Sequence, residues 1–159
     1  VLCGTHGRPF PYARSLQPNN TTGGWTEAKE VGEGLEQTYI GMVCGPDDAL
    51  YITYRLWQRG KPPHPLATYA ALAFQRKPAD SPWQLPQILV VPPFSEYSVY
   101  RHRLTIDRQG RLFLLYDYWS THWFYRNDLR GGRRALLVSS DSGQTWRLAS
   151  AEDLCLKGR

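Results

Sequence analysis

The hydrophobic residues of this 159-residue chain gather in short, aromatic-rich runs that are separated by turn residues. The run at 50–57 reads Leu-Tyr-Ile-Thr-Tyr-Arg-Leu-Trp, and the run at 112–119 reads Leu-Phe-Leu-Leu-Tyr-Asp-Tyr-Trp. Glycine and proline occur along the whole chain, and there is no long helical pattern. Such a chain is predicted to be all-β, with many short strands.

The runs repeat with a spacing of 62 residues. Leu50 recurs as Leu112 and Trp57 as Trp119 (112 − 50 and 119 − 57 are both 62). Each run is followed by a further strand-like run, a turn and another Trp. Period, strand number and turn chemistry are together typical of the four-stranded antiparallel blade of a β-propeller. We therefore expect the end of one blade at 1–30, a second blade at 36–90 and a third at 97–150.

These segments amount to about two and a half blades, whereas a closed propeller has about four to eight. The chain also begins without Met. We therefore expect residues 1–159 to form a single partial propeller domain, with the remaining blades supplied by a longer parent chain. Closure by pairing with copies of itself is the alternative.

The turn at 139–146, Ser-Ser-Asp-Ser-Gly-Gln-Thr-Trp, carries the most specific motif. Its aspartate can accept hydrogen bonds from backbone N–H groups, its glycine can adopt a positive φ, and its Trp can cover the turn. The pattern resembles the Asp-box of sialidase-like β-propellers, a folding device that indicates architecture rather than chemistry. The turns before Trp25 and Trp83 keep the Trp without this aspartate. The residues that match the motif are Ser139, Asp141, Gly143, Thr145 and Trp146.

The chain carries 19 Lys and Arg against 14 Asp and Glu, a formal net charge of +5. A basic surface favours an anionic partner. No recognition helix, zinc-finger spacing or RNA-binding signature is present, so we expect an acidic polysaccharide or oligosaccharide rather than nucleic acid. No apolar run has the length of a membrane-spanning helix, and no membrane partner is expected.

The three cysteines, Cys3, Cys44 and Cys155, include no Cys-x-x-Cys pair, and their disulfide pairing stays open. Cys44 lies in a strand-like run and is predicted to be a buried thiol. No His or Cys cluster has the spacing of metal ligands, so neither a metal nor another cofactor is expected in this chain, while a structural metal in the full-length parent stays open.

Tyr39 and Arg55 are the best candidates for chemistry. They lie 16 positions apart (55 − 39) on either side of a turn near residue 47, so an antiparallel hairpin places them side by side at one end of a blade. An arginine there can hold a carboxylate through two hydrogen bonds. His6 follows a short strand-like run and is predicted to lie near a strand end. The simpler interpretation is a rim tyrosine, a solvated arginine and a turn histidine.

Longer motifs connect these candidates to a known family. They are His-Gly-x-Pro-x-x-Tyr-x-Arg-Ser at 6–15, Thr-Tyr at 38–39 followed by Tyr-Arg at 54–55, and Arg-Leu-Thr-Ile-Asp-x-x-Gly-Arg-Leu at 103–112. In this order they resemble the BNR-repeat family that includes the ulvan-lyase-type polysaccharide lyases. The resemblance implies a seven-bladed propeller, an extracellular or periplasmic location, and cleavage of a uronate-containing glycan by β-elimination.

The resemblance also implies roles for single residues. In that family a His, a Tyr and an Arg act together, and by motif these fall on His6, Tyr39 and Arg55. Arg55 would neutralise the uronate carboxylate, while Tyr39 and His6 would act as acid and base in an order that stays open. By the repeat, Arg101 is the counterpart of Tyr39 (101 − 39 is 62). Further substrate contacts are expected from Tyr97, Tyr100, Arg101 and His122.

Two alternatives to a lyase remain. A sialidase-like glycoside hydrolase would share the Asp-box, but the chain has no Arg-Ile-Pro segment and no clear pair of facing carboxylates. A propeller that keeps its Asp-box without an active site would be a non-catalytic glycan-binding protein.

Overall fold

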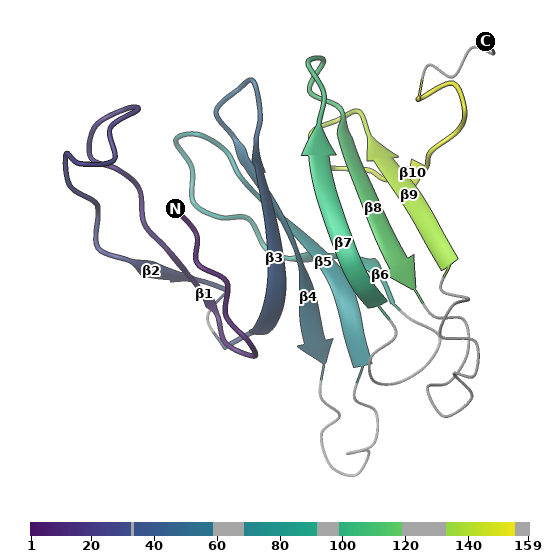
Figure 1. Ribbon diagram of the computed structural model, residues 1–159, viewed down its shortest axis with the longest axis horizontal. Coiled ribbons are helices and arrows are strands. Elements are labelled where there is room, and N and C mark those ends of the chain that lie inside the picture. The colour runs from purple at the N-terminus through teal and green to yellow at the C-terminus, as the bar shows by residue number, and fades with distance from the viewer. Residues whose placement is uncertain (33, 59–68, 92–98, 119–132, 155–159) are drawn as a thin grey trace.

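The computed structural model describes residues 1–32, 34–58, 69–91, 99–118 and 133–154. Every regular element in these residues is a β-strand, so the prediction of an all-β fold is confirmed. They form three antiparallel sheets with the orders β1–β2, β3–β4–β5–β6 and β7–β8–β9–β10 (Figure 1). The strands are β1 (Phe10–Tyr12), β2 (Lys29–Val31), β3 (Glu36–Cys44), β4 (Leu50–Gln58), β5 (Tyr69–Lys77), β6 (Gln87–Val90), β7 (Val99–Ile106), β8 (Leu112–Tyr118), β9 (Arg133–Ser139) and β10 (Arg147–Leu148).

The two four-stranded sheets have the same plan. In each, strands that follow one another along the chain are neighbours in the sheet and run antiparallel. β3 and β7 end at Cys44 and Ile106, which are 62 positions apart (106 − 44). β4 and β8 begin at Leu50 and Leu112, again 62 positions apart (112 − 50). The repeat in the sequence is therefore a repeat of sheets.

The sheets pack face to face, and their buried apolar residues form the core. Burying each large apolar side chain contributes about 1.5–3 kcal/mol, so neighbouring sheets hold one another in place. The cluster between the two four-stranded sheets contains Ala49, Tyr51, Leu72, Phe74, Leu104, Leu112, Leu114 and Tyr116. The cluster between the β1–β2 sheet and the β3–β6 sheet contains Phe10, Val31, Ile52, Tyr54, Leu56 and Ala73.

A tryptophan that follows the third strand of a repeat packs on the preceding sheet. The Trp146 ring meets Phe74 of β5 edge-on, with ring centroids 5.1 Å apart. The Trp83 ring meets Tyr12 of β1 in the same way, at 5.6 Å. Phe74 follows Tyr12 by 62 positions (74 − 12). The β1–β2 sheet therefore packs against the β3–β6 sheet in the same way as the β3–β6 sheet packs against the β7–β10 sheet.

Asp141 organises the turn between β9 and β10. Its carboxylate accepts hydrogen bonds from the Thr145 backbone N–H at 2.9 Å and from the Ser139 hydroxyl at 2.8 Å. The Thr145 hydroxyl and N–H, and after them the Ser139 hydroxyl, lower the pKa of Asp141 to about 2. Gly143 in this turn has a φ of 86° and lies so close to the Phe74 ring that a side chain would clash with it. The turn thus requires glycine for both its backbone and its packing.

The prediction that Cys44 is a buried thiol is wrong. Cys44 is the last residue of β3, an edge strand of its sheet, and it is exposed. A residue at the end of an edge strand lacks the second neighbouring strand that would cover it. Desolvation, and after it the charges of Asp48 and Asp47, still raise the pKa of the Cys44 thiol. Cys3 is exposed as well, and Cys155 lies outside the described residues.

Candidate functional site

Tyr39 stands at a break in the regular pairing of β3 with β4. Thr38 pairs with Arg55, and regular pairing resumes only at Gly41, so Tyr39 lies in a β-bulge. The φ of Tyr39 is 55°, a left-handed conformation that costs a residue with a side chain about 1–2 kcal/mol. Bulges re-aim side chains. Tyr39 is accordingly 55% exposed although it belongs to a strand.

Arg55 lies against the ring of Tyr39. Its guanidinium carbon is 4.5 Å from the centroid of the Tyr39 ring and 5.2 Å from that of the Trp57 ring. Aromatic faces stabilise a cation in this position. Arg55 is only 1% exposed, so its guanidinium does not reach the surface. Direct contact of Arg55 with a substrate carboxylate stays a prediction, because the contact observed is with Tyr39.

His6 completes the group. It forms a backbone bridge with Thr38, the residue before Tyr39, and the next N–H, of Gly7, donates to the Gln37 carbonyl at 2.9 Å. The His6 and Tyr39 rings meet edge-on, with centroids 6.2 Å apart. His6 is exposed. The three residues selected by the family resemblance therefore come together from three segments of the chain.

His102 belongs to the same group, although the sequence analysis did not select it. Its Nδ1 on β7 lies 3.0 Å from the Thr53 hydroxyl on β4. Burial lowers the pKa of His102 to about 4; the Tyr39 carbonyl opposes this shift and the Arg55 charge adds to it. The buried Nε2 of His102 makes no hydrogen bond of normal geometry among the described residues. The sequence held one signal for His102, namely that it directly follows Arg101. Because successive side chains on a strand point to opposite faces, His102 is expected to face the neighbouring sheet when Arg101 does not.

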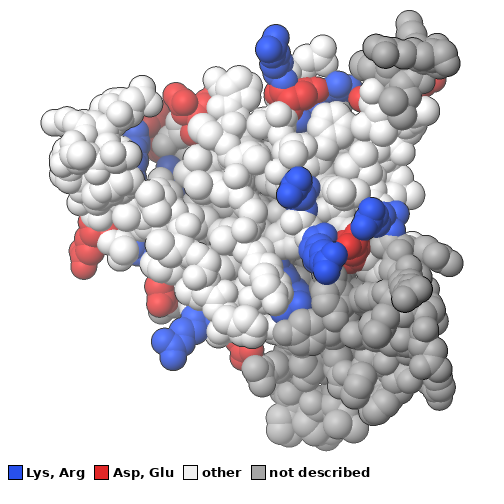
Figure 2. All heavy atoms as spheres, viewed as in Figure 1, with Lys and Arg blue, Asp and Glu red and all other residues white. Residues whose placement is uncertain are grey.

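Two members of the group, Tyr39 and His102, line a hollow of about 840 Å³, whereas His6 and Arg55 are not among its lining residues. Arg101, the counterpart of Tyr39, has a left-handed φ of 27° where the pairing of β7 with β8 shifts between Tyr100 and His102. Two equivalent bulges thus flank the hollow. Basic side chains gather on the face of the molecule formed by β7 to β9, as Figure 2 shows. The lining residues are Tyr39, Ile40, Arg101, His102, Arg103, Leu115, Asp117 and Arg134.

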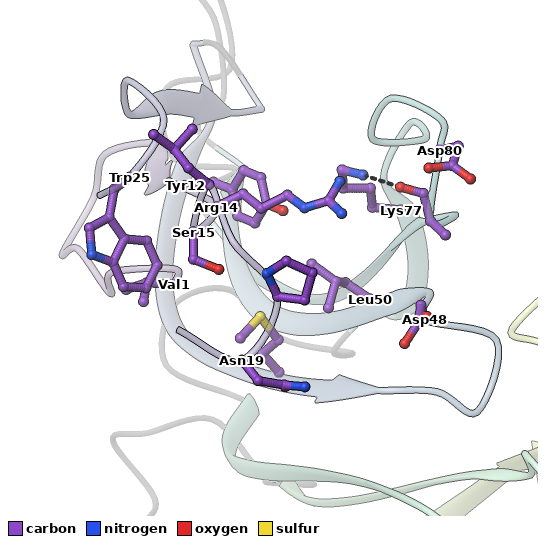
Figure 3. Close-up of a pocket in the computed structure, with 14 residues that line it drawn as sticks. Val1, Tyr12, Arg14, Ser15, Asn19, Trp25, Asp48, Leu50, Lys77 and Asp80 are labelled. Atoms are coloured by element: carbon purple, nitrogen blue, oxygen red, sulfur yellow. Dashed lines mark hydrogen bonds between the residues drawn. The ribbon is translucent and has the colours of Figure 1, made fainter. Parts of the chain in front are cut away.

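A second hollow, of about 630 Å³, lies near the start of β4 (Figure 3). Its two basic residues, Arg14 and Lys77, are balanced by two acidic ones, Asp48 and Asp80. Lys77 Nζ donates a hydrogen bond to the Ala79 carbonyl at 3.1 Å. None of the three predicted catalytic residues lines this hollow. Of these three residues, Tyr39 lines the first hollow, and His6 and Arg55 line neither of the two.

Some of the predicted contacts cannot be placed. Tyr97 and His122 lie outside the described residues, and so does the side chain of Tyr100, whose backbone belongs to β7. Within the described ranges, no group of three or more His, Cys, Asp or Glu side chains could hold a metal ion. The same part of the chain contains no helix with the length and apolar character to cross a membrane.

Comparison with protein-family models gives no match, and comparison with curated proteins gives none either. Among solved structures, the chain is similar to a crystal structure of a protein of unknown function from Dyadobacter fermentans, with a TM-score of 0.59 and 15% sequence identity. The similarity covers 89% of this chain and 43% of that one, so this chain spans less than half the length of that protein. At this identity the likeness shows the fold alone.

Proposed function

We propose that the chain is part of a sialidase-like β-propeller protein that cleaves an acidic, uronate-containing polysaccharide by β-elimination. Repeated four-stranded antiparallel sheets, packed face to face with β3 against β7, support the propeller. In such a fold the first strand of each blade borders the centre, which places Tyr39 and Arg101 beside a shared channel. The segments 36–90 and 97–150 are then two blades, and 1–30 is the end of the blade before them.

The convergence of His6, Tyr39 and Arg55 is the observation that carries the proposed activity. The ring centroids of His6 and Tyr39 are 6.2 Å apart, so both side chains can reach one sugar residue. The left-handed backbone of Tyr39 adds support. Strain of this kind persists only where the surrounding structure imposes it, and it concentrates at functional sites.

β-Elimination needs a cation on the uronate carboxylate, a base for the proton on the adjacent carbon, and an acid for the leaving oxygen. Arg101 is exposed and lines the same hollow as Tyr39, so we assign it to the carboxylate. His6 takes the proton from the adjacent carbon. The electron pair of that C–H bond then forms a carbon–carbon double bond, the glycosidic C–O bond breaks, and the Tyr39 hydroxyl protonates the leaving oxygen.

In this proposal Arg55 acts on Tyr39 rather than on the substrate. Its positive charge, 4.5 Å from the ring centroid, compensates the negative charge that builds up on the phenolic oxygen as the proton leaves. Because Arg55 is 1% exposed, salt and water screen this charge weakly. His102 is neutral at pH 7 and adds no competing positive charge.

The test is the near-ultraviolet absorbance of the unsaturated uronate that forms when a polyuronate is cleaved without water. In the full-length protein that carries this sequence, Tyr39→Phe is expected to lower kcat about 10²–10⁴-fold, because the proton donor is lost. Tyr12→Phe removes a hydroxyl from the second hollow and is the matched control, with normal turnover expected. Equal turnover in the two variants would place the site elsewhere, and reducing ends without the absorbance would indicate a hydrolase.

The burial of Arg55 favours a second candidate, a propeller that binds an acidic glycan without cleaving it. With this guanidinium covered, the exposed cations that line the hollow are Arg101, Arg103 and Arg134. Such a protein would be retarded in a gel that contains acidic polysaccharide and would form no unsaturated product. The absorbance assay and the gel together therefore separate the two functions.

A further inference from the structure

His102 connects the two bulges of the candidate site, because it belongs to one sheet and its side chain reaches the other. On β7 it directly follows Arg101, which we assign to the carboxylate. Its Nδ1 lies 3.0 Å from the hydroxyl of Thr53 on β4, and Thr53 is fully buried. β7 packs against both β3 and β4. The contact between His102 and Thr53 is therefore enclosed by two sheets of the described chain.

The fold does not require a histidine at this position. The counterpart of His102 one repeat earlier is Ile40 (102 − 40 is 62), which packs against the apolar cluster between the β1–β2 and β3–β6 sheets. An apolar side chain is therefore enough to join two sheets here, whereas a buried imidazole needs polar partners. Gly41 leaves room for the polar pair, since a side-chain carbon there would lie 3.3 Å from the Thr53 hydroxyl oxygen. These features indicate that His102 serves the site rather than the packing of the sheets.

His102 also interacts with the backbone of Tyr39. Burial lowers the pKa of His102, and a hydrogen-bonding interaction with the Tyr39 carbonyl opposes that shift. Because Thr53 engages Nδ1, the nitrogen available to this carbonyl is the buried Nε2. A carbonyl oxygen accepts only from a protonated nitrogen, so Nε2 carries the proton and Nδ1 accepts from the Thr53 hydroxyl. Thr53 thus selects the tautomer of His102 that can hold Tyr39.

We propose that His102 is a positioning residue, which holds the Tyr39 bulge through an Nε2–H···O=C contact and so fixes the Tyr39 hydroxyl relative to Arg101. Its role in turnover rests on the proposed function. The φ of Tyr39 is 55°, a conformation that persists only where the surrounding structure imposes it. Hydrogen bonds at a catalytic site are often long or poorly aligned in the free protein and tighten when substrate binds. His102 therefore acts on kcat through the placement of Tyr39.

Nitrogen NMR of the full-length protein with labelled histidine tests the contact without any need for activity. At pH 7 we expect His102 to have a protonated Nε2 and an unprotonated Nδ1, with the signals assigned by their absence in His102→Gln. Thr53→Val keeps the shape of the side chain and removes the donor, so the Nδ1 signal should shift toward that of a nitrogen without a hydrogen bond. A protonated Nδ1 in the wild type overturns the proposal, because Nε2 would then face the Tyr39 carbonyl without a proton.

Separate measurement of kcat and KM on a polyuronate tests the role in turnover. His102→Ile introduces the residue of the preceding repeat and is expected to lower kcat about 10–100-fold with KM changed less than about twofold, because the acid is displaced while the exposed cations remain. His102→Gln is expected to keep kcat within about threefold, since its amide can donate to the Tyr39 carbonyl and accept from Thr53. Ser139→Ala is the matched control for loss of a buried polar side chain. Ser139 pairs with Leu112 at the far end of β8, and normal kcat is expected.

A normal kcat in His102→Ile overturns the positioning role. An equal loss in His102→Gln and His102→Ile also overturns it, because the hydrogen-bonding groups of the side chain would then not matter. If the full-length protein forms no unsaturated uronate, a crystal structure of His102→Ile decides: a Tyr39 that keeps its φ of 55° and its contact with Arg55 overturns the role. A relaxed Tyr39 in that structure, together with the expected tautomer, supports the role and overturns only the proposed cleavage.

Discussion

The two four-stranded sheets share a backbone and differ in their chemistry. Tyr39 and Arg101 occupy equivalent β-bulges, with left-handed φ values of 55° and 27°. Sixteen positions after each of them, β4 carries Arg55 and β8 carries Asp117, so the charge is inverted (55 − 39 and 117 − 101). Arg55 is 1% exposed, whereas the Asp117 side chain is 23% exposed and pairs with Arg134.

This difference shows that the repeat keeps the backbone of the sheet and allows the side chains near the bulge to differ. Strand pairing and the apolar core between the sheets determine the backbone, and both are repeated along with the bulge. The side chains of Tyr39 and Arg101 at the two bulges are exposed, so they can change without loss of the fold. β7 packs against β3 and β4 and helps to enclose Arg55. Within the described residues, no further sheet covers the face of β8 that carries Asp117.

The largest contrast is expected from reversing the two charges in separate variants. Arg55→Asp places a carboxylate against aromatic faces at a site that is 1% exposed, and should lower the free energy of unfolding by about 3–5 kcal/mol. Asp117→Arg alters a partly exposed ion pair and should cost less than about 1 kcal/mol. Urea denaturation measures both values. Similar losses in the two variants would show that the equivalent positions are equally buried.

The turn around Gly143 is expected to give the next largest effect. Gly143→Ala pushes a methyl group into the Phe74 ring at a φ of 86° and should cost about 3 kcal/mol. Gly34→Ala is the matched control, because its φ is 73° but no atom other than its chain neighbours lies within 4 Å of the added carbon. Only backbone strain, about 1 kcal/mol, is expected there. A loss in Gly143→Ala that does not exceed the control in thermal unfolding would mean that the turn can move away from Phe74.

A difference in pH dependence is expected to distinguish His102 from its apolar counterpart Ile40 (102 − 40 is 62). The folded protein holds the pKa of His102 at about 4, below the ordinary value of 6.5, so the unfolded chain binds the proton first. The stability that the neutral His102 contributes is therefore fully present above about pH 6.5 and is lost as the pH falls through 4, by about 3 kcal/mol in total.

His102→Gln keeps a polar partner for Thr53 and should remove this part of the pH dependence. The measurement is the free energy of unfolding at a series of pH values between 4 and 7. Asp141, whose pKa is lowered to about 2, titrates below this window and leaves it undisturbed. If the variant keeps the wild-type slope between pH 4 and 6.5, another group is responsible for it.

The smallest effect is expected at the two bulges. Glycine adopts a left-handed backbone without strain, so Arg101→Gly should raise the free energy of unfolding by about 0.5–1 kcal/mol. Tyr39→Gly relieves the same strain but removes the ring that contacts Arg55, so no net gain is expected. Denaturant midpoints measured side by side test this, and an equal gain at both positions would mean that the contact between Tyr39 and Arg55 contributes no stability.

Local patterns in the sequence were enough to predict most of the strands. The runs at 50–57 and 112–119 correspond to β4 and β8, because alternation of side chains and the turns that bound a strand are local properties. The expectation that Tyr39 lies beside Arg55 required only one hairpin. The bulge altered its detail, since the residue opposite Arg55 is Thr38.

The turn before Trp25 shows where a residue-by-residue comparison falls short. This turn has no aspartate, but Asn20 Oδ1 accepts hydrogen bonds from the N–H groups of Thr22 and Gly23, both at 2.9 Å. The indole N–H of Trp25 donates to the Thr21 carbonyl at 3.2 Å. An amide oxygen can thus organise a turn as a carboxylate does, which a search for aspartate alone does not reveal.

The sequence by itself determined the all-β character, the 62-residue repeat of strands and the turn around Asp141, because each depends on residues that are close together in the chain. Only the tertiary structure decided that Arg55 is buried against Tyr39, that Cys44 is exposed, and that an imidazole from one sheet meets a hydroxyl of the other across 49 positions of sequence. These features depend on which strand lies at an edge and on how one sheet packs against the next. Packing of this kind joins distant segments, and no local pattern of residues records it.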